Sequence, residues 1–452
     1  MKVGFACSDI TPRVGVELCG FGPFLNRHST GVHDPLTAKA MAIDDGATGF
    51  ILVACDIVAI PLAMTQDIRA RVAEQTGISP GALMICCSHT HSGPTTFHYE
   101  GWGDPDPPYL HTLPGRIAHA ATEAWERREE ASFGLAAVPC TGIAINREYD
   151  RHCVPPEEAL VPGWAPDKPE LTDTTCHVVT AHSDRGLIGF FSHFSCHPVV
   201  CCEANTLIHG DFVGLASNEV ARENDCIGLF VQGAQGDVNS CIAHESPDVS
   251  MKSLAIIADR YATCLRQGIA EAKPIDVDTI RHVAREPVFS RIDWDEQKLR
   301  ELLHEKQRRL ETLDAHEGSH ELRLEMVLIG GLERMLRTLA EGGTLRPATQ
   351  IQGLKLGPVA LLGSGFEVFQ AINNEIVSAS EHCVTLVAGL TNDAMGYATD
   401  RDTAARGGYA QQQVPLMGAS LAYARIHDEL RDEMIALSQD LSDHPQPSGS
   451  TP

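Results

Sequence analysis

Positive charge is scarce in this chain of 452 residues: 35 Lys and Arg stand against 60 Asp and Glu, which gives a formal net charge of −25. Phosphate backbones and anionic lipids repel such a chain, so we expect it to bind neither nucleic acid nor a membrane surface. Long apolar runs are missing too. No window approaches the roughly 20 apolar residues that span a bilayer, and residues 1–12 contain no hydrophobic stretch typical of a secretory signal.

Cysteine is abundant, at 15 residues, but the spacings that would give it a structural role are missing. The pairs Cys86-Cys87 and Cys201-Cys202 are adjacent rather than spaced as C-x-x-C, which argues against a structural zinc knuckle. Cysteines inside apolar segments of so large a chain are typical of reduced, buried thiols, so we expect a cytoplasmic protein. No Gly-x-Ser-x-Gly elbow lies near a plausible His and Asp, which disfavours serine hydrolase chemistry.

Strand-like and helix-like segments alternate along most of the chain. A hairpin is expected over 38–55, strands over 82–87, 177–181, 187–195, 226–231, 349–363 and 383–388, and helices over 65–75, 110–130, 211–224, 253–271 and 411–438. This order favours an α/β fold with mixed β-sheets and flanking helices in one large domain, residues 1–437. Residues 294–340 are expected to form an inserted helical hairpin broken at Gly318-Ser319. Residues 438–452 are rich in Ser, Pro, Asp and Gly and are expected to be disordered.

The strongest local motif is His89-Thr90-His91, which follows an apolar strand. If the strand continues through it, residues two apart point to the same side and both imidazoles face one pocket. The alternative is a pair of hydrogen-bonded loop histidines. His197 ends the apolar run of 187–195 in the same way, and alternation would place it on one side with His193. The alternative for His197 is a structural role before the turn-forming Pro198.

Three further segments bear on the site. The loop from Gln232 to Asn239 is rich in small residues, which let backbone N–H groups approach a ligand. Glu367 lies among apolar residues, where a carboxylate must be paired, protonated or bound to metal, unless it is a solvated first-turn residue of a helix. Tyr397, taken alone, is typical of a packed aromatic side chain.

Taken together, these motifs resemble the catalytic domain of the neutral (non-lysosomal) ceramidases. The resemblance follows the order of the family along most of the chain. It rests on Asp9-Ile10-Thr11-Pro12, Gly20-Phe21-Gly22, residues 31–38, Ser88 to Pro94, Asn146-Arg147, His197-Pro198, Gly236-Asp237-Val238, Gly365-Phe366-Glu367, residues 389–397 and Tyr409.

The resemblance implies a zinc-dependent hydrolase that cleaves an amide bond with metal-activated water. It implies that four residues hold Zn²⁺, namely His89, His197, Glu367 and Tyr397. It implies that three catalytic residues hold the scissile amide, namely His91, Arg147 and Tyr409. Substrate contacts are expected from Gly20, Gly236, Asp237 and Asn239. Two imidazoles and a carboxylate are a familiar catalytic zinc set, although the same donors would also accept iron or manganese.

The chain departs from the family pattern in places that affect mechanism and substrate. The family's Gly-Asp-Val-Ser-Pro-Asn reads Gly-Asp-Val-Asn-Ser-Cys over 236–241, so Asn239 replaces the serine that a nucleophilic mechanism would use. Its Pro-Gly-Glu becomes Gly365-Phe366-Glu367. The chain ends soon after the last expected helix, so we expect no C-terminal immunoglobulin-like domain, and a small, soluble N-acyl amide rather than long-chain ceramide as substrate.

The sequence is also compatible with other functions. The same site would serve an esterase or lactonase, and a degenerate scaffold would give a non-catalytic binding protein. The helical insertion of 294–340 is compatible with a wall or lid of the pocket, with the interface of a homo-oligomer, or with a solvated charged surface.

Overall fold

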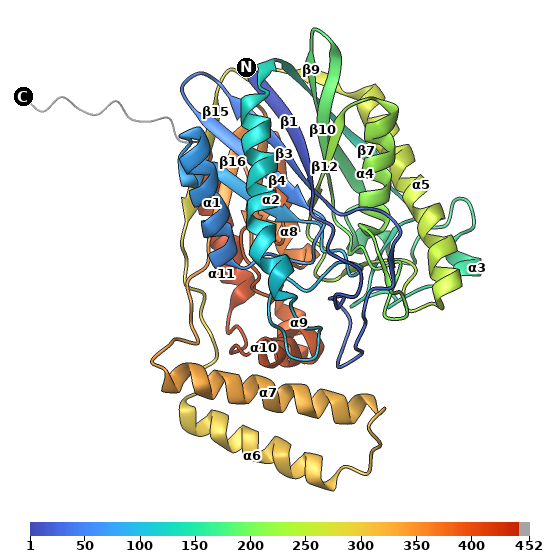
Figure 1. Ribbon diagram of the computed structural model, residues 1–452, viewed down its shortest axis with the longest axis vertical. Coiled ribbons are helices and arrows are strands. Elements are labelled where there is room, and N and C mark those ends of the chain that lie inside the picture. The colour runs from blue at the N-terminus through green and yellow to red at the C-terminus, as the bar shows by residue number, and fades with distance from the viewer. Residues whose placement is uncertain (443–452) are drawn as a thin grey trace, which may run out of the picture.

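The first of three β-sheets contains most of the N-terminal strands. The computed structural model describes residues 1–442 (Figure 1). The sheet has the order β5-β4-β3-β1-β6 and consists of β1 (Lys2–Asp9), β3 (Thr37–Asp44), β4 (Gly49–Cys55), β5 (Leu83–Cys87) and β6 (Glu129–Glu130). The expected hairpin is confirmed, because β3 and β4 pair antiparallel with Asp44 opposite Gly49. Helices α1 (Leu62–Thr76) and α2 (Pro107–Glu126) cover this sheet.

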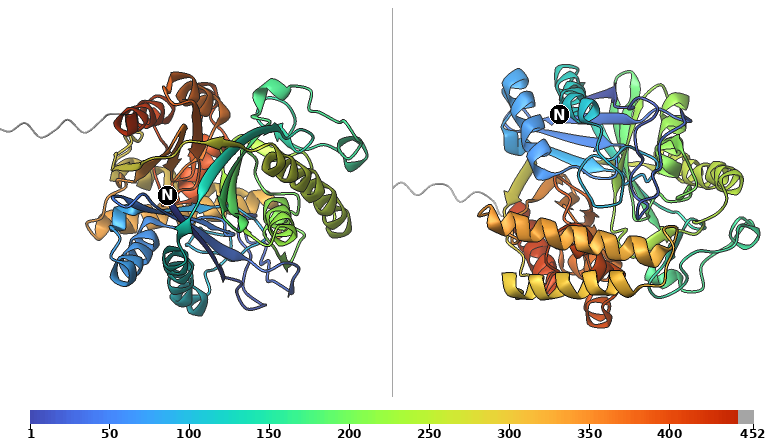
Figure 2. Two further views of the ribbon diagram at one scale, coloured as in Figure 1. Left: turned by 90° about the horizontal axis from the view of Figure 1, so that it is seen from above. Right: turned by 60° about the horizontal axis from the view of Figure 1, so that its bottom comes forward.

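The second sheet packs against the first. It has the order β12-β10-β9-β7-β14 and consists of β7 (Ser132–Pro139), β9 (Thr175–Ser183), β10 (Gly186–Phe194), β12 (Ile227–Gln232) and β14 (Lys273–Ile275). Phe191, Leu229 and Val231 of this sheet share one buried cluster with Ile51 and Leu52 of β4. Helices α4 (Asp211–Glu223) and α5 (Pro247–Glu271) lie on its outer side (Figure 2). The two sheets therefore bury a common core between two pairs of helices.

The third sheet follows the helical insertion. Its order is β15-β16-β17-β19, with β15 (Ile280–Arg285), β16 (Ile351–Leu356), β17 (Val359–Ser364) and β19 (Val384–Ala388). Helices α8 (Gln370–Ala379) and α11 (Ile426–Ser442) pack against it. Short helices α3 (Pro156–Ala159) and α9 (Arg401–Arg406) and the 3-10 turns Pro80–Ala82 and Pro169–Leu171 complete the connections. The mixed α/β architecture expected from the sequence is confirmed.

Three two-stranded pairs connect segments that are far apart in the sequence. They are β2 (Gly31–Val32) with β11 (Leu207–Ile208), β8 (Ala144–Asn146) with β13 (Val238–Ser240), and β18 (Glu367–Val368) with β20 (Tyr397–Ala398). The loops after β5, β10, β12, β17 and β19 meet near these pairs. The contacts include hydrogen bonds from His197 N to Val238 O (2.9 Å) and from Gly389 N to Gln232 O (3.0 Å). Strand ends of all three sheets thus converge on one region.

The insertion of 294–340 forms the expected antiparallel helical hairpin, α6 (Glu296–Thr312) and α7 (His320–Ala340). Figure 1 shows it as a separate layer beneath α10 (Val414–Met417). Glu325 of α7 is buried and pairs with Lys306 at 3.4 Å and Arg309 at 3.0 Å, which joins the two helices. A side chain at Gly331 would overlap the Leu416 carbonyl, so glycine permits the close approach of α7 to α10.

The prediction of a single helix over 411–438 is wrong. A π-helical turn over Tyr409–Gln413 leads into α10, and the chain then leaves the helix before α11 begins at Ile426. Pro415 cannot donate a backbone hydrogen bond, and Tyr423 in the connecting stretch pairs with Arg291 in a β-bridge. Pairing with another segment therefore replaces helix continuation here. Helix α11 also runs to Ser442, beyond the boundary expected at 438, and the rest of the expected disordered tail lies outside the described residues.

No helix within residues 1–442 combines the length and the hydrophobicity that crossing a bilayer requires.

Candidate functional site

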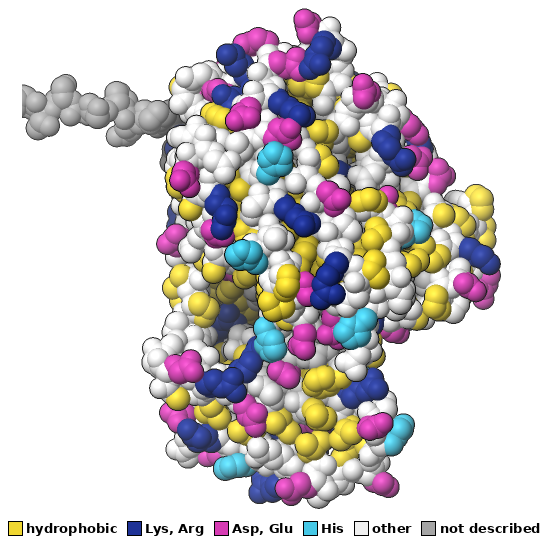
Figure 3. Space-filling view, in the orientation of Figure 1, with side chains coloured by type: hydrophobic (Ala, Val, Ile, Leu, Met, Phe, Trp, Pro, Cys, Tyr) yellow, Lys and Arg dark blue, Asp and Glu magenta, His cyan; other side chains and the backbone are white. Residues whose placement is uncertain are grey.

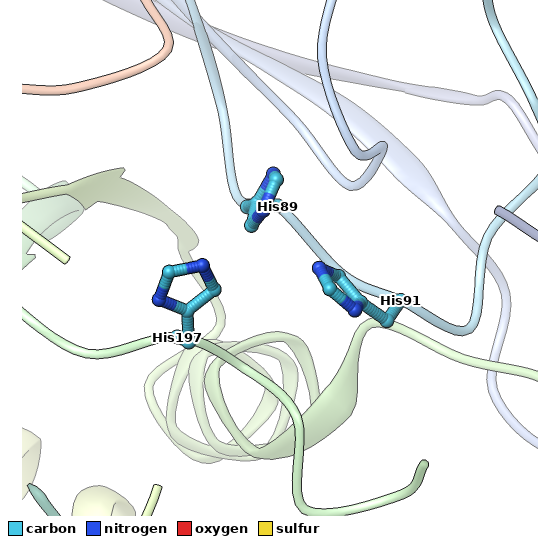
Figure 4. Close-up of side chains that lie close together, drawn as sticks. All are labelled: His89, His91 and His197. Carbon is cyan, nitrogen blue, oxygen red and sulfur yellow. The ribbon is translucent and has the colours of Figure 1, made fainter. Parts of the chain in front are cut away.

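Three histidine rings meet where the first and second sheets end (Figure 4). The ring centroids of His89 and His91 are 4.7 Å apart, and His197 lies 5.0 Å from His89 and 6.0 Å from His91. One nitrogen of each ring lies within 4.8 Å of the others, close enough for a metal ion to bind all three.

The route by which His89 and His91 converge differs from the sequence expectation. Strand β5 ends at Cys87, and His89 takes a left-handed backbone conformation with φ 67. The prediction that strand alternation points both imidazoles to one side is therefore wrong. A turn at His89 brings the two rings together. His193, expected on the side of His197, instead places its Nε2 3.0 Å from Val387 O and does not line the site.

Backbone carbonyls fix the orientation of two of these rings. His89 Nδ1 lies 2.7 Å from Val58 O, and His197 Nδ1 lies 2.5 Å from Gln235 O. Since a carbonyl only accepts, each Nδ1 carries a hydrogen, which leaves Nε2 to face the site. Burial, reinforced by Arg147, lowers the pKa of His197 to about 4, so this ring is neutral at pH 7. A neutral imidazole whose second nitrogen is held by the backbone is the usual form of a metal-ligating histidine.

Glu367 completes the donor set. Its Oε2 lies 2.9 Å from His197 Nε2 and 3.4 Å from His89 Nε2, and the residue is only 8% exposed. Burial alone would raise the pKa of this carboxyl, but the two neighbouring imidazoles hold it well below its ordinary value. The parallel pairing of β18 with β20 sets Glu367 opposite Tyr397, so both side chains reach the same cavity. A buried carboxylate beside two imidazoles is the environment that a divalent cation stabilises.

Arg147 connects several expected site residues. Its Nη2 donates to Tyr397 OH at 2.9 Å and to Gly236 O at 2.7 Å, and its Nη1 donates to Asn239 Oδ1 at 3.1 Å. The pairing of β8 with β13 places Arg147 near Asn239, which itself forms a β-bridge with His197. The guanidinium therefore fixes the Tyr397 hydroxyl. Burial raises the pKa of that tyrosine well above its ordinary value, so it is protonated at pH 7.

His91 and Tyr409 are the least constrained of the expected catalytic side chains. Both ring nitrogens of His91 are buried and make no hydrogen bond within the described part of the chain. Tyr409 starts the π-helical turn, is 46% exposed, and has its ring centroid 6.2 Å from that of Tyr397. Both residues line the cavity, where their polar atoms are available to a ligand.

Gly236 and Asp237 lie behind the cavity wall rather than on it. Asp237 accepts hydrogen bonds from Asn146 Nδ2 at 2.9 Å and from Gln370 N at 2.8 Å, which ties the segment before Arg147 to the start of α8. A Cβ on Gly236 would lie 2.6 Å from Glu367 O, so glycine lets this loop approach the carboxylate residue. The structure thus places both residues where they support the site, whereas Gly20 and Asn239 line the cavity directly.

The cavity has a volume of about 490 Å³ and is mostly apolar. Sequence reasoning missed much of its wall, which includes Val58, Phe97, Tyr99, Trp102, Leu324 and Met417. The aromatic run of 97–102 shortly after His91 was the available signal for part of this wall. Leu324 and His320 come from α7, so the helical insertion forms part of the wall. Figure 3 shows a recess with hydrophobic side chains between the α6–α7 layer and the rest of the molecule.

Comparison with known proteins shows the family and supports the fold. Residues 1–250 match the family described as neutral/alkaline non-lysosomal ceramidase, N-terminal. The chain belongs to this family. Among solved structures, neutral ceramidase from Pseudomonas aeruginosa superposes with a TM-score of 0.72 at 19% identity, covering 100% of this chain and 76% of that one. A ceramidase complexed with C2 gives 0.75 at 18%, covering 100% and 77%. The resemblance inferred from the motifs is thus confirmed.

The donor atoms of this site fit a bound metal ion. The fit rests on the ring nitrogens of His89 and His197, which are oriented by carbonyls, and on the buried carboxylate of Glu367. Tyr397 lies beside Glu367 across the β18–β20 pair, while the unpartnered nitrogens of His91 offer a further donor. Imidazole and carboxylate are both common zinc ligands.

The Gly20→Ala variant is expected to unfold more easily and to displace His91. Gly20 has φ +100, and a Cβ there would overlap the His91 ring. Gly46→Ala is the matched control, because Gly46 has φ +90 with no atom within 4 Å of the new Cβ. The control should lose roughly 1–2 kcal/mol of stability from backbone strain, and Gly20→Ala about 1–3 kcal/mol more from overpacking. Urea unfolding measures both, and equal losses would show that His91 does not pack on Gly20.

Proposed function

We propose that this chain is a zinc-dependent hydrolase that cleaves the amide bond of a small, neutral N-acyl compound. The observation that carries the proposal is the buried group of His89, His197 and Glu367 at an apolar cavity of about 490 Å³. A cavity of this size is typical of sites for small organic ligands.

In this proposal, His89, His197, Glu367 and Tyr397 hold the zinc ion. Bound there, zinc supplies a Lewis acid and lowers the pKa of a water molecule towards about 7. Val58 O and Gln235 O keep the imidazoles of His89 and His197 oriented. Arg147 keeps the Tyr397 hydroxyl in place through its hydrogen bond of 2.9 Å.

The remaining residues act on the carbonyl of the substrate. His91 and Tyr409 have polar atoms at the cavity that can donate hydrogen bonds to the oxygen as it gains negative charge. Arg147 adds positive charge nearby, although its hydrogen-bonding groups already bind Tyr397, Gly236 and Asn239. These three residues therefore share the stabilisation of the oxyanion.

A serine nucleophile finds no support at the position where the family has one. Asn239 occupies that position and accepts a hydrogen bond from Arg147. Ser240, the next residue, is fully buried, donates to Ile242 O at 2.9 Å, and does not line the cavity. This arrangement favours water as the attacking group.

The apolar wall supports a neutral acyl substrate. Among the described residues, Glu367 and Arg147 are the only Asp, Glu, Lys or Arg side chains that line the cavity, and most of the other lining residues are aromatic, aliphatic or histidine residues. Away from those two, a charged substrate group would lose its hydration without gaining an ion-pair partner. We also infer a reducing compartment such as the cytoplasm, since all 15 cysteines lie in the described residues and none forms a disulfide. A homo-oligomer through the helical insertion stays a prediction.

The test is a substrate panel measured before and after removal of metal. N-acyl amines of increasing acyl length are compared with nitrophenyl esters and lactones, using protein treated with chelator and protein restored with zinc. The proposal expects amide cleavage that is lost on chelation and recovered with zinc. Ester or lactone turnover without amide cleavage would identify a different carbonyl substrate on the same site. Full activity after verified metal removal would contradict the zinc mechanism.

The Leu324→Ala variant is expected to change acyl-length preference. Leu324 projects from α7 into the cavity wall, so its truncation enlarges the apolar space. The ratio of kcat/KM for long over short acyl groups should rise about 10-fold, the typical effect of a small change in pocket volume. Met326→Ala is the control, because Met326 is on the same helix and 46% exposed. An unchanged ratio in Leu324→Ala would mean that the acyl group does not reach α7.

A further inference from the structure

A second group of metal-ligating side chains lies at the same cavity, apart from the three histidines. Ligand atoms of Cys202, Glu203 and His244 all lie within 4.8 Å of one another. His244 Nδ1 is 3.0 Å from Glu203 Oε2, and these two side chains are 37% and 41% exposed. Cys202 is buried beneath them. His244 lines the cavity and is partly exposed to solvent.

His152 is a fourth side chain beside this group. Its Nε2 lies 3.1 Å from His244 Nε2, and the two rings stack at 5.1 Å with 16° between their planes. Glu203 Oε2 accepts a hydrogen bond from His244 Nδ1, and His244 Nε2 then accepts one from His152. A divalent cation would replace the hydrogen between Nδ1 and Oε2, and His244 Nε2 would then donate to His152. A partner on the second ring nitrogen is the usual support of a histidine that binds metal.

We propose that Cys202, Glu203 and His244 form a second site, which binds a thiophilic divalent ion of the zinc class. One sulfur, one imidazole and one carboxylate match the donors that zinc takes, with a fourth position left for water. Calcium and magnesium do not fit, because they prefer oxygen ligands. The proposal does not depend on the hydrolase function, since it shares no ligand with the first site.

The two sites are nevertheless connected. The Phe21 ring lies between them, with its centroid 4.8 Å from the His91 ring and 6.1 Å from the His244 ring. Arg27 lies over Phe21 and donates to His91 O at 2.5 Å and to Cys202 O at 3.2 Å. An ion at the second site would thus sit at the rim of the cavity, on a loop braced against the one that carries His91.

Cobalt titration separates the two sites because only the second contains a thiolate. The probe is Co²⁺ added to chelator-treated full-length protein under reducing conditions, with stoichiometry and the thiolate-to-cobalt charge-transfer band measured together. Two ions per chain and a charge-transfer band are expected. His89→Ala should lose one ion and keep the band. Cys202→Ser should lose one ion and the band, while Cys153→Ser, which alters an exposed cysteine outside the group, should keep both.

Since Cys202 is buried, its variant could fold poorly, so His244→Ala provides a second test at an exposed position. Removal of this ligand should weaken binding of the band-forming ion by at least about 100-fold, more than the loss of a supporting residue. A wild-type protein without the band, or a band that persists in Cys202→Ser, would overturn the proposal. A wild-type protein that binds only the band-forming ion, in the same amount as His89→Ala, would contradict the proposed hydrolase and leave this site standing.

Discussion

The His197→Ala variant is expected to contain one zinc per chain fewer than the wild type and to lose amide hydrolysis. His197 Nε2 lies 2.9 Å from Glu367 Oε2, and its Nδ1 is held by Gln235 O, so the ring is fixed with Nε2 towards the carboxylate. Loss of a supporting residue alone costs roughly 10–100-fold in metal affinity, and loss of a ligand should cost more. Elemental analysis and substrate turnover measure the two effects on the same sample.

His98→Ala is the matched control for this experiment. His98 follows the His89–His91 motif by a few residues, but its ring pairs with Glu100 at 3.4 Å and it does not line the cavity. Metal content and turnover should stay at wild-type values in this variant. A full zinc complement in His197→Ala would show that His197 is not a ligand, and the site would then have to rest on His89, His91 and Glu367.

The Arg147→Ala variant is expected to lower kcat by about 10²–10³, a loss as large as that from removing a direct donor from an oxyanion site. The loss has two physical sources: positive charge near the substrate carbonyl disappears, and the Tyr397 hydroxyl loses the donor that fixes it at 2.9 Å. Steady-state kinetics with the best N-acyl substrate gives kcat and KM separately. Zinc content, measured alongside, tells whether Tyr397 still supports the metal.

Arg151→Ala controls for the loss of an arginine from the same segment. Arg151 forms surface ion pairs with Glu158 and Asp167, at 2.7 and 2.9 Å, and takes no part in the cavity wall. Pairs of this kind contribute at most about 1 kcal/mol, so its activity should be unchanged. Equal kinetics in both variants would remove Arg147 from the proposed mechanism.

Local sequence patterns predicted much of the fold. The β3–β4 hairpin, helices α1, α4 and α5, and the α6–α7 hairpin follow from hydrophobic periodicity and turn residues, both of which act over a few neighbouring positions. The prediction of one helix over 411–438 was wrong because a long-range contact decides the conformation there. The connecting stretch pairs Tyr423 with Arg291, a contact between segments more than a hundred residues apart. No property of the local sequence records such a partner.

The candidate site divides in the same way. The motif residues His89, His91 and His197 were identifiable because histidines after apolar strands are unusual, and the order of motifs along the chain indicated the family. Their convergence was assigned to strand alternation, whereas the turn at His89 with φ 67 produces it. The second group, Cys202, Glu203 and His244, carries no recognisable spacing in the sequence, because its histidine comes from a separate loop.

The sequence by itself determined the family, the α/β class and the chemical types of the site residues, because motifs and periodicity are properties of neighbouring residues. Only the tertiary structure decided which residues face the cavity. It placed Gly236 and Asp237 behind the wall, set Glu367 opposite Tyr397 through the β18–β20 pair, and brought Leu324 of α7 to the cavity wall. These outcomes depend on strand register and helix packing between distant segments, and the free energy that selects them comes from burial of the whole core.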